Sequence, residues 1–219
     1  MVIPREARKI TYSTEIRNLI KRLTLSNYQR AVLVGNILGD GHLEPNWSKT
    51  NYKLKINHNL KHKDYVMWKY NVFRNWVLTK PKFDKWNNSF QFRTISHREI
   101  TELRNKFYKD GKKIVPSDIN LYLNNPITLA VWFMDDGNAI LRKVVGGKKI
   151  LRGYHLNSQS FTPEENLILK ETLSDLYGLS VGLERNHGNY RIYINKSSVN
   201  RLRELIADYI IPSMRYKLG

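Results

Sequence analysis

LVGNILGDG, residues 33–41, is the stretch that decides the fold expected of this chain, because a second version, LAVWFMDDG, occupies residues 129–137. Each copy is a short apolar run of helical character that ends in Asp followed by Gly. The two copies stand at equivalent places in the two halves of the sequence. They therefore predict two helices that pack against each other at the centre of a duplicated, two-lobed molecule.

The ends of these two helices carry the chemistry. We expect Gly41 and Gly137 to follow the helices in the left-handed conformation that Gly adopts readily. Asp40 and Asp136 then lie at the negative end of a helix dipole, which costs each carboxylate roughly 0.3–1 kcal/mol. Crossing the helices brings the two acids together and adds like-charge repulsion. A divalent cation offsets both costs, and Mg²⁺ prefers hard oxygen ligands such as carboxylates, water and phosphate.

The composition indicates a polyanionic partner. Lys and Arg number 37 against 19 Asp and Glu, which gives a formal net charge of +18. Such a balance favours a nucleic acid, although a ribosomal-type or merely basic protein would share it. The absence of Cys excludes disulfides, Cys-based zinc sites and thiol catalysis. No apolar run approaches the roughly 20 residues that a membrane span requires, so no membrane partner is expected.

Each half of the sequence begins with one of the two stretches and predicts the same order of elements: helix, two strands, helix, two strands, helix. Tyr52, Leu54 and Ile56 alternate with polar residues, as a half-buried strand requires. Thr162, Pro163 and two glutamates predict a helix start, with Gly178 as its end. The expected helices are 27–40, 62–77, 97–108, 127–136, 163–177 and 197–209, and the expected strands are 52–58, 82–86, 89–95, 139–145, 149–158, 180–185 and 190–195. The predicted division is a helical arm over 1–24, a first repeat with its linker over 25–125, and a second repeat over 126–219.

The two stretches resemble the paired motifs of the LAGLIDADG homing endonucleases, in their single-chain form with two pseudo-symmetric repeats. The matching residues are Gly35, Asp40 and Gly41 in the first copy and Leu129, Ala130, Asp136 and Gly137 in the second. Asp135 stands where the family has a small residue, and Asp136 alone shares the position of Asp40 before the Gly. The resemblance implies an α+β fold of two αββαββα repeats, with an antiparallel β-saddle and a central two-helix interface.

The resemblance also implies the activity and its residues. A monomer of this family cuts double-stranded DNA at a long asymmetric site, in intron or intein homing, by metal-dependent phosphodiester hydrolysis. The expected ion is Mg²⁺, with Mn²⁺ as an expected substitute. The catalytic candidates are Asp40, Asp136, Lys113 and Lys217, where Lys113 precedes an apolar-Pro segment in the linker and Lys217 lies in the tail. The metal candidates are Asp40, Asp136, Gly39 and Asp135.

The outward faces of the predicted strands supply candidates for DNA binding. Arg and Lys pair with guanine, and Asn and Gln pair with adenine, in the major groove. The alternative is that these are solvated strand faces. The candidates are Lys53, Lys55, Asn57, Gln91, Arg93, His155, Asn157, Gln159, Arg191 and Asn195. Lys55 and Asn157 also lie near positions where the family places a polar side chain that orders water.

Two other functions are compatible with the same fold. An intron RNA maturase would bind RNA and assist splicing without cutting, and it would not need both acids. A regulator that only binds DNA would not need Lys113 or Lys217. The presence of both acids and both lysines favours the nuclease without excluding a dual role with RNA.

Overall fold

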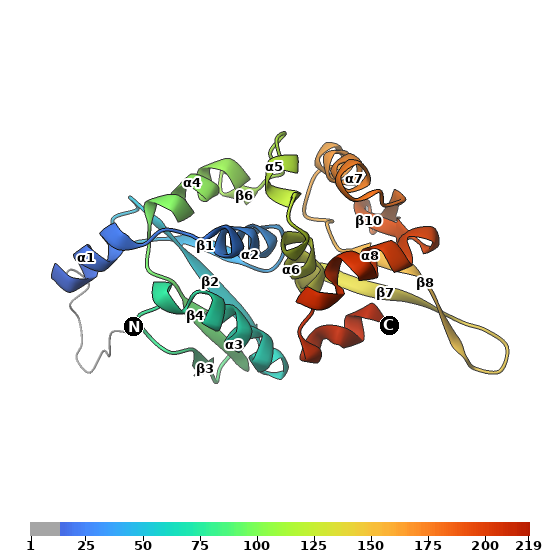
Figure 1. Cartoon of the computed structure of the whole chain (residues 1–219), viewed down its shortest axis with the longest axis horizontal. Coiled ribbons are helices and arrows are strands. Elements are labelled where there is room, and N and C mark those ends of the chain that lie inside the picture. Colours follow the sequence, from blue (N-terminus) through green and yellow to red (C-terminus); the bar gives the residue numbers. More distant parts are fainter. Residues whose placement is uncertain (1–13) are drawn as a thin grey trace. The chain divides into compact units, whose positions relative to one another are not determined.

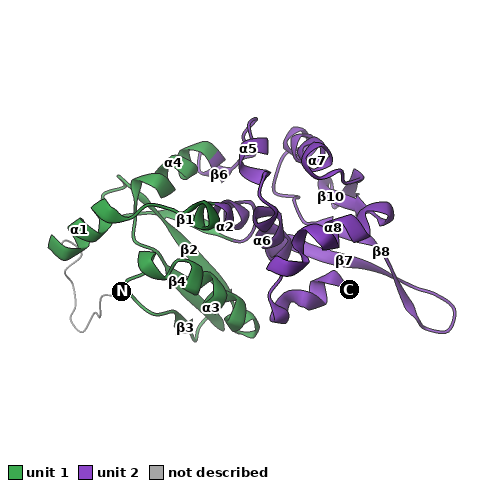
Figure 2. Ribbon diagram, in the orientation of Figure 1, with its two compact units in different colours: residues 1–30, 41–106 green, residues 31–40, 107–219 purple. Residues whose placement is uncertain are grey.

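The structure, a computed structural model, describes residues 14–219. Residues 1–13 of the predicted N-terminal arm lie outside the described residues. The described chain forms two compact units, one of residues 14–30 and 41–106 and the other of residues 31–40 and 107–219 (Figure 2). These packing units differ from the repeats expected from the sequence, because residues 31–40 at the end of the first organising helix pack with the second unit. No described helix is long and apolar enough to cross a membrane.

Unit 1 is built on a four-stranded antiparallel sheet of order β1-β2-β4-β3 (Figure 1). Leu54 and Ile56 of β2 are fully buried under α3, while Lys53 and Lys55 lie on the opposite face of the sheet. This is the alternation that the sequence predicts. Its elements are α1 (Thr14–Arg22), the start of α2 (Asn27–Leu38), β1 (His42–Pro45), β2 (Tyr52–Asn59), α3 (Lys63–Val72), β3 (Lys82–Asp84), β4 (Ser89–Arg93) and α4 (Arg98–Phe107), with 3-10 turns at Leu60–His62 and Arg74–Trp76.

Unit 2 has a second four-stranded antiparallel sheet, of order β7-β8-β10-β9. Its apolar face packs on α7, and α6 packs on α8. Thr162 and Glu165 form the capping box of α7, and Gly178 ends that helix in the left-handed conformation, as predicted. Its elements are the rest of α2, β5 (Tyr108–Lys109), β6 (Lys112–Lys113), α5 (Asn120–Leu123), α6 (Pro126–Asp136), β7 (Gly137–Lys143), β8 (Lys149–Leu156), α7 (Pro163–Tyr177), β9 (Val181–Asn186), β10 (Asn189–Asn195) and α8 (Val199–Ile206), with 3-10 segments at Lys196–Ser198, Ala207–Tyr209 and Pro212–Leu218.

The two halves repeat one topology, which confirms the α+β class and the predicted order of elements. In each sheet the strands lie in the sequence order first, second, fourth, third. Three predicted helices are shorter than expected. The one over 27–40 ends at Leu38, two residues before Asp40. The one over 62–77 is α-helical only to Val72, and the one over 197–209 only from Val199 to Ile206, and 3-10 turns continue these two. No range was predicted for β1, and the β5–β6 ladder and α5 were not predicted, because elements of two to four residues are too short to show a periodic pattern.

Within unit 2, the end of α2 lies against α6 at two glycines. A Cβ on Gly35 would lie 2.7 Å from the Thr128 carbonyl oxygen and 2.7 Å from the Val131 Cβ. One turn later, a Cβ on Gly39 would lie 2.5 Å from the Asp135 Cβ. Real Cβ atoms do not approach other atoms so closely, so only Gly permits this contact. The sequence predicted the close approach of the two helices, and the structure confirms it.

We expect Gly35→Ala to destabilise the protein, because the added methyl group forces α2 and α6 apart. The free energy of unfolding should fall by about 1–3 kcal/mol, as overpacking of a tight core does. Urea denaturation measures this change. Gly182→Ala is the matched control, since its Cβ would meet nothing nearer than 3.7 Å. Equal stability of the two variants would contradict a steric requirement at Gly35.

Candidate active site

Three carboxylates gather in unit 2 at the ends of α2 and α6. Carboxylate oxygens of Asp40 and Asp135 lie within 4.8 Å of one another. The Asp40 backbone N–H donates a hydrogen bond of 3.1 Å to Asp135 Oδ2. Asp136 is the next residue of α6, and the negative charges of Asp40 and Asp135 both raise its pKa. The structure therefore brings together all three acids that the sequence proposed, with Gly39 between the helices.

The electrostatics of Asp136 reflect this crowding. Burial, followed by the negative charges of Asp40 and Asp135, raises the pKa of Asp136 to about 7, although Lys113 and Lys217 act in the opposite direction. A carboxyl group with this pKa holds a proton near neutrality unless a cation replaces it. The donor set consists of hard oxygen atoms, so the residues present fit a divalent ion such as Mg²⁺ or Mn²⁺.

Each helix end also receives a lysine. Lys113, on β6, donates to the carbonyl oxygen of Gly39. Lys217, in the segment Pro212–Leu218, donates to the carbonyl oxygen of Asp135 at 2.7 Å. Gly39 and Asp135 occupy equivalent positions, immediately before Asp40 and Asp136. The two lysines therefore make the same contact in the two repeats, and each compensates a carbonyl at the negative end of a helix.

The conformation of the glycines after the acids differs from the prediction. Gly137 is extended, with φ −79° and ψ 149°, and Gly41 does not have a positive φ either. α6 passes directly into β7, so no left-handed turn is needed. Gly137 is required for space instead, because a Cβ there would lie 2.3 Å from the Phe133 ring. The prediction of left-handed caps was therefore wrong at both glycines, and this reason accounts for Gly137.

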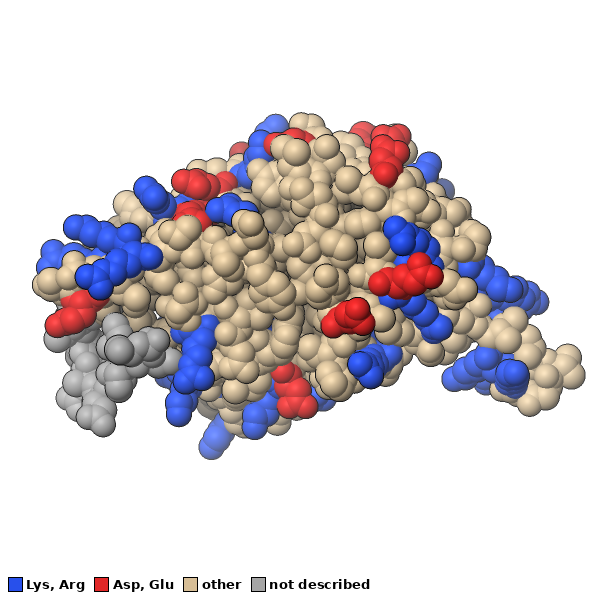
Figure 3. All heavy atoms as spheres, viewed as in Figure 1, with Lys and Arg blue, Asp and Glu red and all other residues tan. Residues whose placement is uncertain are grey.

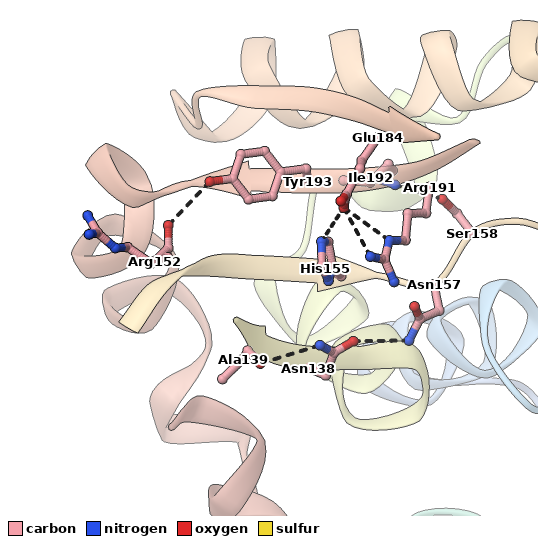
Figure 4. Close-up of polar contacts among 10 residues, drawn as sticks. All are labelled: Asn138, Ala139, Arg152, His155, Asn157, Ser158, Glu184, Arg191, Ile192 and Tyr193. Atoms are coloured by element: carbon pink, nitrogen blue, oxygen red, sulfur yellow. Dashed lines mark hydrogen bonds and ion pairs between the residues drawn. The ribbon is translucent and has the colours of Figure 1, made fainter. Parts of the chain in front are cut away.

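Asn157 fixes the end of α6 from the strand side. Its backbone N–H and its side-chain Nδ2 donate to the Asp136 carbonyl oxygen, at 3.0 and 2.8 Å. The same Nδ2 lies 3.2 Å from Asn138 Oδ1 (Figure 4). Asn157 was proposed as a residue that contacts DNA or orders water. In the structure its amide nitrogen holds the peptide that links Asp136 to the sheet.

In unit 1, the proposed DNA-binding residues lie together on one face of the sheet. Lys55 is opposite Arg93 and Asn57 is opposite Gln91 in the β2–β4 ladder, and Lys53 precedes them on β2. Four of the five, all except Asn57, line a cavity of about 940 Å³. Two further features were missed by sequence reasoning. Glu44 forms an ion pair of 2.8 Å with Lys55, and Trp47, 94% exposed, also lines the cavity.

In unit 2, two of the proposed residues meet at an acid that sequence reasoning missed. Glu184 on β9 lies between His155 and Arg191, and its Oε2 accepts from His155 Nε2 and, at 3.2 and 3.1 Å, from Nε and Nη2 of Arg191 (Figure 4). Burial, followed by the charge of Arg191, lowers the pKa of His155. The strand register signals this cluster, since Glu184 pairs directly with Arg191.

The other two proposed residues of unit 2 are not part of this cluster. Asn195, at the end of β10, donates from its amide to Ser180 Oγ at 2.6 Å. Gln159 follows the end of β8.

Exposed basic residues also flank the β7–β8 turn and form a projecting patch (Figure 3). These residues, which the sequence did not single out, are Arg142, Lys143, Lys148 and Lys149.

The comparisons with known proteins identify the family. The sequence profile described as the LAGLIDADG DNA endonuclease family matches residues 30–202. The chain belongs to this family. It is 30% identical over 203 residues to the probable intron-encoded endonuclease 1 of Wickerhamomyces canadensis, covering 89% of this chain and 85% of that protein. The homing endonuclease I-WcaI, solved bound to its DNA recognition sequence, superposes with a TM-score of 0.84 at 28% identity, covering 95% of this chain and 94% of that one.

Two other kinds of relative are similar over most of this chain. The cytochrome b mRNA maturase bI2 of Debaryomyces hansenii is 26% identical over 225 residues, covering 94% of this chain and 82% of the maturase. Protein RecA of Mycobacterium shimoidei is 30% identical over 204 residues, which is 89% of this chain. The chain spans about half the length of the RecA relatives, 47% in this case. The family resemblance seen in the two motifs is confirmed, as is the homing endonuclease fold.

The raised pKa of Asp136 predicts a pH dependence of stability. Folded Asp136 keeps its proton up to about pH 7, whereas the unfolded residue loses it near 3.8. Without divalent ions, the free energy of unfolding should therefore fall as pH rises from 4 to 7, by at most about 1.4 kcal/mol per pH unit from this group. Asp136→Asn should remove this part of the slope in urea denaturation with EDTA. Asp175→Asn, at an exposed site on α7, is the control and should keep it.

Proposed function

We propose that this chain is a site-specific endonuclease that hydrolyses phosphodiester bonds of double-stranded DNA with the help of a divalent metal ion, in intron or intein homing. The observation that carries the proposal is the site in unit 2, where both helix ends of the family motif present an acid beside a lysine-bound carbonyl. The similarity to an intron-encoded endonuclease and to a DNA-bound homing endonuclease supports the substrate class.

The roles of the residues follow from their positions. Asp40 and Asp136 would hold the metal ion, with Asp135 and the Gly39 carbonyl beside it. When bound, such an ion supplies positive charge against the scissile phosphate and favours ionisation of water. Mg²⁺ is the ion we propose, and Mn²⁺ offers the same hard-ligand chemistry. Lys113 and Lys217 add cationic charge near the acids, where negative charge develops on the phosphate.

The polar faces of the sheets would bind the DNA. Lys55, Asn57, Gln91 and Arg93 in unit 1, and His155 and Arg191 in unit 2, present donors and acceptors of the kinds that read base edges in the major groove. The net charge of +18 favours contacts with the phosphate backbone, which supply affinity without sequence information. The protein would act as a monomer, because one chain carries both acids.

RNA binding in intron splicing is the second candidate function. The similarity to a cytochrome b mRNA maturase over 94% of this chain favours it. Such a role would use the basic surfaces and would not need the acid pair. A splicing assay with Asp40→Asn separates the two functions, because loss of cleavage with retained splicing assistance would demonstrate both.

Replacement of either acid should abolish cleavage and preserve binding. We expect Asp40→Asn and Asp136→Asn to lower the rate at which a duplex library is cut with Mg²⁺ by at least about 100-fold, because each removes a ligand charge from the metal site. The dissociation constant for duplex DNA should stay within about threefold, since phosphate contacts dominate affinity. Asp175→Asn, on the exposed face of α7, serves as the control. Cleavage at the parental rate by either variant would refute the role of that acid.

Glu184 and Arg191 should determine preference at the same base pair. Arg191→Lys removes a bidentate donor, which is worth about 1–3 kcal/mol of discrimination at guanine. Glu184→Gln should relax preference at that same position, because the carboxylate fixes the guanidinium. Sequencing the products cut from a randomised duplex library measures both effects. Arg185→Lys, on the opposite face of β9, should leave the profile unchanged. Relaxation at two unrelated positions would contradict a shared role.

A further inference from the structure

The proposed catalytic Lys217 lies on a segment that belongs to neither the sheet nor the α-helices. Pro212–Leu218 is a 3-10 segment, and its Lys217 must reach the Asp135 carbonyl oxygen at 2.7 Å. A lysine side chain has a long flexible stem and loses considerable rotamer entropy when it is held. The position of its ammonium group therefore depends on how firmly the segment is attached to the rest of unit 2.

Arg203 of α8 and Tyr154 of β8 attach this segment immediately beside Lys217. Arg203 Nη2 donates to the main-chain oxygens of Leu218 and Gly219, at 2.7 and 3.0 Å. Arg203 Nε donates to the Tyr154 hydroxyl at 2.7 Å, and that hydroxyl donates to the Leu218 carbonyl oxygen at 2.9 Å. Three hydrogen bonds thus converge on the main-chain oxygens of Leu218 and Gly219, the two residues that follow Lys217.

The anchor is continuous with the helix that carries the acids. Tyr154 is fully buried, and its ring makes a T-shaped contact with the Phe133 ring of α6. The ring centroids are 5.3 Å apart and the ring planes meet at 83°. Phe133 lies two residues before Asp135 in the same helix. Burial raises the pKa of Tyr154, so its hydroxyl stays protonated and remains a donor. The same framework therefore holds α6 and the segment that brings Lys217 to it.

The contacts of Arg203 indicate that it positions the main chain beside Lys217. Among the described residues Arg203 donates to the Tyr154 hydroxyl and to main-chain oxygens of Leu218 and Gly219, and no ion pair with an Asp or Glu side chain is found. Arg201, two residues earlier on the same helix, contrasts with it. Arg201 pairs with Glu204 and donates to the Tyr177 carbonyl oxygen, away from the segment. The planar fork of Arg203 matches two adjacent main-chain oxygens and a hydroxyl, a set that the ammonium of Lys could not satisfy in the same geometry.

We propose that Arg203 and Tyr154 are positioning residues that fix Lys217 beside the acids of α6. This proposal rests on the proposed endonuclease function, because Lys217 has a catalytic role only in that reaction. Neither residue touches the substrate in this scheme. Their contribution is to limit the positions that the Lys217 ammonium can occupy.

A double-mutant cycle tests the proposal on the full chain. Arg203→Met and Tyr154→Phe should each slow single-turnover cleavage of a duplex site about tenfold, as loss of orientation does, with the dissociation constant for the duplex unchanged. Lys217→Met should have a similar effect. The double variant Arg203→Met/Lys217→Met should cut no more slowly than Lys217→Met, because Arg203 acts through Lys217. Arg201→Met is the matched control and should retain the parental rate.

A second measurement does not depend on cleavage of DNA. Release of the segment should expose the bond after Arg215, so trypsin should cut there several times faster in Arg203→Met than in Arg201→Met, as mass spectrometry would show. Additive losses in the cycle, or equal proteolysis of the two variants, would overturn the proposal. If the parental protein cuts no duplex, the endonuclease function fails, and the proteolysis result still decides whether Arg203 holds the segment. Tyr154→Phe, which removes a single hydroxyl, serves the same purpose should Arg203→Met not fold.

Discussion

The contact between the end of α2 and α6 is the constraint on which the rest of the site depends. Gly35 and Gly39 allow the two backbones to approach until a Cβ would collide with Val131 and Asp135. This approach buries Asp136 and brings acids from two distant parts of the sequence together. Burial first, and then the charges of Asp40 and Asp135, raise the pKa of Asp136. The lysines at the two helix ends offset part of this cost. A divalent ion and a phosphate backbone would offset more of this cost.

The sequence predicted the fold well because its signals are repeated and periodic. Two copies of one motif, an alternating β2 strand and the capped helix α7 specify the architecture without any distant contact. The positions of Lys113 and Lys217 came from the family resemblance and not from a pattern in the residues. The structure places them at equivalent carbonyls, a relation that depends on the tertiary fold. The conformation of Gly137 was mispredicted, because a Gly after a helix indicates either a left-handed turn or lack of space, and the sequence does not distinguish the two.

The acidic residues on the polar sheet faces could not be assigned from composition. Glu44 and Glu184 are two of only 19 acids in a strongly basic chain, and each contacts a residue proposed to bind DNA. Their partners lie on neighbouring strands, so the register decides the pairing. An acid in such a place holds a cationic side chain in one orientation before any ligand arrives. Fixing the orientation of a cationic side chain favours selectivity. The acid that fixes it also lowers the total positive charge of the surface, which does not favour affinity.

The junction between α6 and β7 has a consequence for redesign of the protein. Asp136 and Gly137 are consecutive, and Asn157 at the end of β8 binds the carbonyl between them. The group that would cut DNA and the sheet that would recognise it therefore share one peptide plane. Substitutions near Asn157 that retarget the enzyme to a new sequence would also shift the carboxylate, so turnover would decline together with the old preference. Positions towards the β7–β8 turn are far along the strands from this plane, and they are the part of the sheet that can be rewritten independently.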